Sequence, residues 1–105
     1  MAKSIAEMAQ QFGMNIGELE TIRDGILAMV AKVKPSLGQS GMEMDTSFQE
    51  VGMDSLTVIS TVFEIEEFFG IDIFGRHLET VSTLEDTLAV VAELLVAKRH
   101  AEAAA

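Results

Sequence analysis

Apolar residues recur at intervals of three and four positions along most of this 105-residue chain, which is the spacing of one face of an α-helix. The pattern predicts a first long helix from about Gly17 to Val33. Pro35 ends this helix, because proline cannot continue a helix and disfavours helical backbone in the residue before it. The segment from 34 to 41 combines proline, glycine and serine, and it is predicted to be a loop.

A second long helix is predicted to begin at Asp54, whose carboxylate can accept the free amide groups of the first turn, and to stop at Gly70. Its apolar positions include the stripe that we expect to be buried: Ile59, Val62, Ile65 and Phe69. Three residues of the last helix are expected to face that stripe: Leu84, Leu88 and Val91.

The last helix is predicted to begin with a capping box, in which Ser82 caps the amide of Glu85 and Glu85 reaches back to Ser82. The cations at 98–100 lie where the helix dipole favours them, and we expect residues 101–105 to fray. Two shorter segments complete the chain. Ile5–Phe12 is predicted to be an extra helix, and a loop at 71–74 is predicted to lead into a short helical turn near Gly75 to Leu78.

Together these segments predict an all-α fold, a small four-helix bundle with three main helices, one short helix and an N-terminal helical extension. The length fits one domain. We divide the chain into an extension at 1–17 that holds the extra helix, a bundle domain at 18–97 and a C-terminal tail at 98–105.

Negative charge dominates the middle of the chain. The formal net charge is −10, and no lysine or arginine occurs between Lys34 and Arg76. Such a chain cannot neutralise a phosphate backbone, which excludes nucleic acid as a partner, and it is not suited to anionic membranes. The acidic span is either a solvated face or a docking face for basic partners.

Cysteine is absent, so any thiol chemistry must use a sulfur from outside the chain. This composition fits the cytoplasm, and we expect no secretory signal and no membrane-spanning helix. His77 and His100 lack partners at metal-ligand spacing, and no motif ties either histidine to Ser55. We therefore predict neither a metal site nor a hydrolase.

Ser55 follows the predicted cap at the mouth of the second long helix. Unpaired amides and the helix dipole favour an anion there, so a phosphodiester on Ser55 would lie in a compatible field. Gly52 leaves room for another protein to approach the serine. From these features alone, Ser55 is either an attachment site or an ordinary first-turn residue.

The segments around this serine resemble the acyl carrier protein family. That family has a Leu-Gly-x-Asp-Ser-Leu motif opening its second helix, and about fifteen residues later a Glu-Glu-x-Phe-Gly-Ile-x-Ile segment. Here the chain reads Val51-Gly52-Met53-Asp54-Ser55-Leu56, and then Glu66-Glu67-Phe68-Phe69-Gly70-Ile71-Asp72-Ile73. Phe48 and the segment 80–84 match further family positions, and the resemblance extends from about residue 18 to residue 97.

The resemblance implies a stand-alone carrier of acyl-carrier fold rather than an enzyme. A phosphopantetheinyl transferase would use coenzyme A and magnesium to attach 4′-phosphopantetheine to Ser55, and Asp54 matches the aspartate that helps to place the magnesium. Acyl- or aminoacyl-activating and acyl-transfer enzymes would dock through basic patches. The expected partner contacts are Leu56, Phe63, Glu66 and Glu67. We expect a monomer.

Some positions depart from the familiar fatty-acid carriers. Thr57 and Ser60 stand where those carriers usually have acids, and Phe68 replaces another common acid. Phe63 and Phe68 are either peripheral core or exposed partner contacts. These departures and the N-terminal extension speak against routine fatty-acid elongation and resemble a dedicated carrier of a secondary or specialised pathway. We expect a role in lipid, polyketide or another specialised biosynthesis, with an aminoacyl carrier and a non-modified helical adaptor as alternatives.

Overall fold

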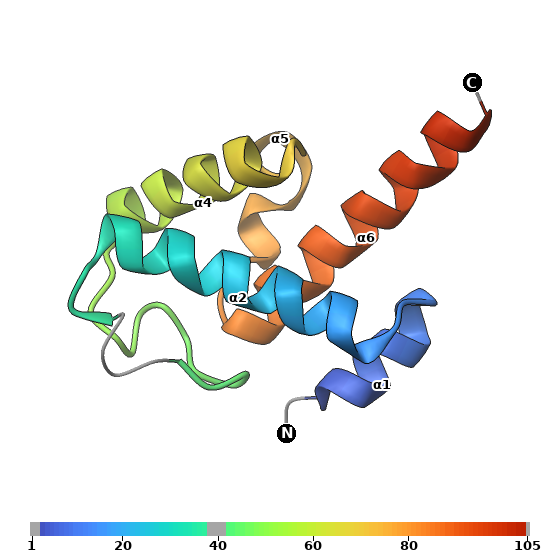
Figure 1. The fold of residues 1–105 in the computed structure, drawn as a ribbon. Helices are drawn as coiled ribbons and strands as arrows, with labels where there is room; N and C mark the ends of the chain where they lie inside the picture. The colour runs from blue at the N-terminus through green and yellow to red at the C-terminus, as the bar shows by residue number, and fades with distance from the viewer. Residues whose placement is uncertain (1–2, 38–41, 105) are drawn as a thin grey trace.

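The computed structural model describes residues 3–37 and 42–104, so residues 38–41 of the predicted loop lie outside the described residues. The described chain is all-α, as predicted, and its one β feature is an isolated bridge between Ser47 and Thr83. Figure 1 shows the arrangement of the elements, which in chain order are α1 (Ile5–Phe12), α2 (Ile16–Val33), α4 (Ser55–Phe69), α5 (Phe74–His77), a 3-10 turn (Leu78–Thr80) and α6 (Leu84–Ala104).

Helix α2 is the centre of the bundle, because it packs against α4, α6 and α1 (Figure 1). Its buried residues are Leu19, Ile22, Ile26 and Val30. Their spacing of three and four places them on one face, which forms the core with apolar residues of α4 and α6. The predicted start at about Gly17 lies one residue inside the observed helix, which Asn15 caps through the Glu18 amide.

Helix α4 begins after Asp54 and ends before Gly70, as predicted. Gly70 has φ 68°, the left-handed conformation that glycine adopts without strain. The predicted inward stripe is correct for Val62 and Ile65, which are buried, but Ile59 and Phe69 are only partly buried. Phe69 packs at the edge of the core, and Ile59 lines a hollow beside Ser55.

The predicted capping box of α6 is wrong by one residue. The amide of Asp86 donates to Thr83 Oγ1 and the amide of Thr83 donates to Asp86 Oδ2, each at 3.1 Å. The reason is tertiary, because the loop at 44–48 pairs with this segment. Phe48 donates to the Ser82 carbonyl, and Glu85 donates its amide to the Met44 carbonyl.

Helices also lie near both ends of the described part of the chain. Helix α1 is confirmed over Ile5–Phe12, with a capping box between Ser4 and Glu7. Residues 101–104 continue α6 instead of leaving it, against our expectation. The expected short turn is α5, which begins one residue earlier than predicted. Among the described helices, none has the length and apolar character needed to cross a membrane.

Candidate functional site

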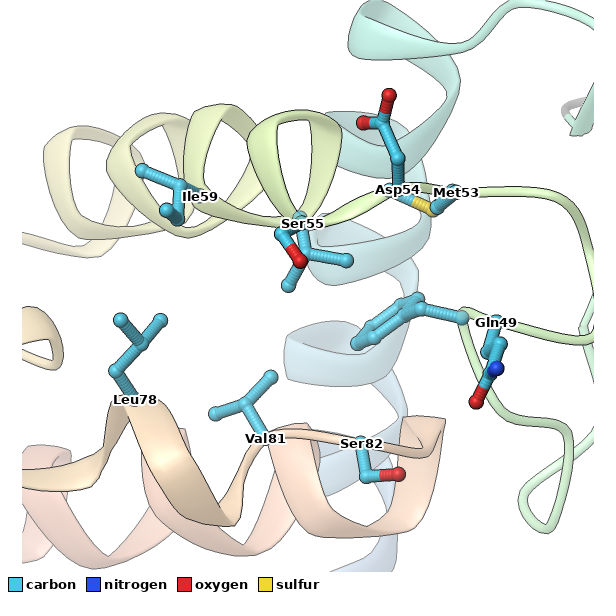
Figure 2. Close-up of a pocket in the computed structure, with 10 residues that line it drawn as sticks. Gln49, Met53, Asp54, Ser55, Ile59, Leu78, Val81 and Ser82 are labelled. Atoms are coloured by element: carbon cyan, nitrogen blue, oxygen red, sulfur yellow. The ribbon is translucent and has the colours of Figure 1, made fainter.

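Ser55 is the first residue of α4, and its side chain is exposed. Among the described residues, its hydroxyl has no hydrogen-bond partner. Figure 2 shows the Ser55 side chain on the side of α4 that faces Leu78 and Val81. A nucleophilic hydroxyl that is free, exposed and next to helix-terminal amides is chemically suited to carrying a phosphodiester.

Asp54 precedes Ser55 and caps the helix. Its Oδ1 atom accepts from the Thr57 hydroxyl at 2.7 Å and from the Thr57 amide at 2.8 Å. These two bonds hold the pKa of the Asp54 carboxyl below its usual range, and the nearby charge of Lys34 lowers this pKa further. Asp54 is therefore ionised at neutral pH, and it points away from Leu78 and Val81 (Figure 2).

The turn before Asp54 is fixed by backbone hydrogen bonds. Gly52 donates to the Gln49 carbonyl and Met53 donates to the Phe48 carbonyl, both at 3.0 Å. Gly52 has φ 83°, so a residue with a side chain would be strained there. Lys34, at the end of α2, donates from Nζ to the Gly52 carbonyl at 3.0 Å.

A hollow of about 570 Å³ opens beside Ser55, between α4 and the segment that leads from the 3-10 turn into α6 (Figure 2). Six of the ten residues that line it are apolar: Phe48, Met53, Val58, Ile59, Leu78 and Val81. Polar groups of Gln49, Asp54, Ser55 and Ser82 complete it. An apolar group tethered to Ser55 by a flexible arm could be sheltered from water there.

Two of the predicted partner contacts are exposed on α4. Leu56 is 72% exposed and Phe63 is 49% exposed. They are two helical turns apart and share a face with Glu67. Phe63 also contacts Phe74 of α5, with ring centroids 5.1 Å apart, so the apolar surface continues onto the next helix.

Glu66, another predicted partner contact, has a structural role. Its Oε2 atom accepts from the Ile73 amide at 2.6 Å and from the Phe74 amide at 2.9 Å. The carboxylate thereby fixes the loop between α4 and α5, and it is less available to a partner than Glu67, which is exposed.

Sequence reasoning missed four contributors to this site. Val58 could have been found, because it lies one helical turn after Ser55. Leu78 and Val81 come from a segment distant in sequence, and no local pattern indicated their position. The sequence marks Lys34 only as the last basic residue before the acidic span, and it gives no sign of its contact with Gly52.

Comparison with known proteins agrees with this geometry. Residues 24–91 match the family model described as "Phosphopantetheine attachment site". The chain belongs to the acyl carrier protein family, whose prosthetic group is covalently attached 4′-phosphopantetheine. The free Ser55 hydroxyl and the adjoining hollow fit such a group.

Three relatives illustrate the likeness. The chain is 37% identical over 62 residues to an acyl carrier protein of Onion yellows phytoplasma, covering 58% of this chain and 80% of that protein. It is 32% identical over 79 residues to chloroplastic acyl carrier protein 2 of Arabidopsis thaliana, covering 75% of this chain and 57% of that protein. Chloroplastic acyl carrier protein 1 of Spinacia oleracea is 31% identical over 70 residues, covering 66% of this chain and 51% of that protein. The chain thus spans about half the length of these plant relatives. No solved structure matches significantly.

Proposed function

We propose that this chain carries acyl-type groups as thioesters on a 4′-phosphopantetheine arm attached to Ser55 Oγ, and that it presents them to partner enzymes without catalysing a step itself. One observation carries the proposal: an exposed hydroxyl without a partner among the described residues lies at the start of α4, beside a hollow with six apolar residues in its lining. The family match supports the same assignment.

The chain's own residues would act at two stages. During attachment, Ser55 Oγ is the nucleophile toward the phosphorus of coenzyme A, and Asp54, already ionised, would help to hold magnesium beside it. When bound, the arm supplies a terminal thiol that can be acylated. Phe48, Ile59 and Val81 would then shield from water the part of the carried acyl group that enters the hollow.

The hollow favours an acyl load over an aminoacyl load. An aminoacyl group carries an ammonium at neutral pH, and transfer of that charge from water to an apolar surface is unfavourable. Among the described residues that line the hollow, Asp54 alone has a carboxylate, which is held by Thr57 and directed away from Leu78 and Val81 (Figure 2). An aliphatic acyl chain meets no such cost.

For partner docking, we propose the surface formed by Leu56, Phe63, Glu67 and Phe74, which we name the α4 docking face. It combines exposed apolar area with an exposed carboxylate, and its α4 residues lie on the same helix as Ser55. A phosphopantetheinyl transferase and acyl-handling enzymes with basic residues around an apolar socket would match it.

The attachment is tested by intact mass. The full chain is incubated with coenzyme A, magnesium and a promiscuous phosphopantetheinyl transferase, and we expect the mass gain of one arm. Ser55→Ala should abolish the gain, whereas Ser60→Ala, which removes an exposed hydroxyl further along the same helix, should retain it. A wild-type chain that gains no mass would favour the non-modified adaptor, and labelling of Ser55→Ala would move the attachment site.

We assign the carrier to the cytoplasm and to lipid, polyketide or another specialised biosynthesis. A free thiol on the arm stays reduced in the cytoplasm, which suits this role. The plant relatives are chloroplastic, so a fluorescent fusion in the source cell would distinguish the two compartments.

A further inference from the structure

Both ends of α4 are held by the same kind of contact, a lysine ammonium that donates to the carbonyl of a glycine. Lys34 Nζ lies 3.0 Å from the Gly52 carbonyl, before the helix, and Lys98 Nζ lies 3.2 Å from the Gly70 carbonyl, at its end. Both glycines have positive φ, and a Cβ added to either would come within about 3.0 Å of the lysine nitrogen. Lys34 ties α4 to α2, and Lys98 ties it to α6.

Of these two contacts, the one made by Lys34 bears on the attachment site. The turn at 48–53 directs its Gly52 and Met53 amides inward, to the Gln49 and Phe48 carbonyls. The Lys34 bond holds the remaining polar group of Gly52, its carbonyl, so both polar groups of the peptide unit between Gly52 and Met53 are held: the carbonyl by Lys34 and the amide by Phe48. Met53 is buried, and the next two residues are Asp54 and Ser55.

We propose that Lys34 is a positioning residue for the modification of Ser55: by holding the Gly52 carbonyl, its ammonium fixes the turn that presents Asp54 and Ser55 to a transferase. This inference rests on the proposed function. In the step concerned, Ser55 Oγ forms a bond to the phosphorus next to the pantetheine of coenzyme A. The pyrophosphate bond breaks, adenosine 3′,5′-bisphosphate leaves with the electron pair, and the hydroxyl proton passes to a base of the transferase or to water.

The sign of the charge makes the inference specific. The chain is strongly acidic, and the transferase surface that we propose to contact it is basic. Replacing Lys34 by a neutral residue makes the chain more acidic, which favours encounter with a basic partner. Slower modification of such a variant therefore reports lost positioning rather than lost attraction.

The test compares Lys34→Met and Lys34→Arg with Lys98→Met in the full chain. Lys98→Met is the matched control, because it removes the same charge and the same type of bond at the far end of α4. We expect Lys34→Met to lower kcat of the transferase about fivefold to tenfold without raising KM, as expected when one charge-assisted hydrogen bond no longer holds the reacting group. Lys34→Arg should restore most of the rate, and Lys98→Met should react like wild type.

A second measurement does not depend on the transferase. Amide hydrogen exchange of Gly52 and Met53 should accelerate in Lys34→Met but not in Lys98→Met, at equal melting temperature. Equal kcat for wild type and Lys34→Met, or unchanged exchange at both amides, would overturn the inference while the proposed function stands. A rise in KM alone would overturn it too, because Lys34 would then be a docking residue. A wild-type chain that gains no arm would overturn the proposed function and this inference together.

Discussion

At the scale of single residues, the site depends on two hydrogen bonds from Thr57 to Asp54. Asp54 has two tasks, since one carboxylate oxygen caps α4 while the ionised group lies beside the proposed attachment serine. Thr57 connects the two tasks, because its hydroxyl and its amide both donate to that oxygen. At the position where fatty-acid carriers usually have an acid, this chain therefore has a donor that lowers the pKa of Asp54.

We expect Thr57→Val to raise the pKa of the Asp54 carboxyl toward its usual range, because the hydroxyl donor is lost while the amide remains. A depressed folded-state pKa stabilises the fold above the unfolded-state pKa, and this contribution disappears as pH falls through the folded-state pKa. Thr57→Val should therefore be less stable than wild type at neutral pH, and the difference should vanish in acid.

Side-chain ¹³C NMR titration of Asp54, with denaturant unfolding at each pH, measures both effects. Thr21→Val is the control, because the Thr21 hydroxyl donates to the backbone carbonyl of Gly17. An Asp54 titration curve identical in wild type and Thr57→Val would contradict the claim that the Thr57 hydroxyl lowers the pKa of Asp54.

At the scale of elements, α4 has two aromatic surfaces with different roles. Phe68 lies against Gly25 of α2 and contacts Phe69 edge-on, so its ring covers the junction of α2 and α4. Phe63 instead faces Phe74. Phe68 and Phe63 are similarly exposed, and their different neighbours assign only Phe63 to the proposed α4 docking face.

We expect Phe63→Ser to weaken binding of a phosphopantetheinyl transferase about tenfold, mainly by raising the dissociation rate, as for an apolar contact near the centre of an interface. Phe68→Ser removes a ring of similar exposure from the other surface and should leave affinity near wild type.

Glu67→Lys should slow association and flatten its salt dependence, because an exposed charge acts mainly on the encounter. Surface plasmon resonance at two salt concentrations separates these effects, and equal losses for Phe63→Ser and Phe68→Ser would refute the assignment.

At the scale of the whole molecule, the N-terminal extension is part of the core. Met8 and Ala9 of α1 and Met14 after it are buried, and α1 packs against both α2 and α6. The Lys3 amide also donates to Glu85 at the start of α6. Because α2 begins at Ile16, a domain boundary after residue 17 would fall inside a helix. We therefore propose that α1 belongs to the folding unit.

Met8→Ala should then lower the free energy of unfolding by about 2–5 kcal/mol, the range measured for large-to-small changes at buried positions. Gln10→Ala on the exposed face of α1 should change it by less than about 0.5 kcal/mol. Urea denaturation followed by circular dichroism gives both values. A wild-type unfolding curve for Met8→Ala would show that α1 is attached only loosely.

The amino-acid sequence alone determined most of the elements and pointed to the proposed attachment residue. Periodic apolar residues, the Asp54 cap, Pro35 and Gly70 are local signals, and they predicted the start of each helix to within a residue or two. The Gly-x-Asp-Ser-Leu motif also indicated Ser55 without any knowledge of its surroundings.

Tertiary structure decided what lies around that serine. Thr83, and not Ser82, caps α6, because backbone groups of the 44–48 loop form hydrogen bonds with the Ser82 carbonyl and the Glu85 amide. Ile59 is only partly buried because it lines the same hollow as Leu78 and Val81. Lys34 reaches Gly52 across 18 positions of sequence. Such contacts depend on how helices pack, and a local pattern carries no information about partners that only folding brings together.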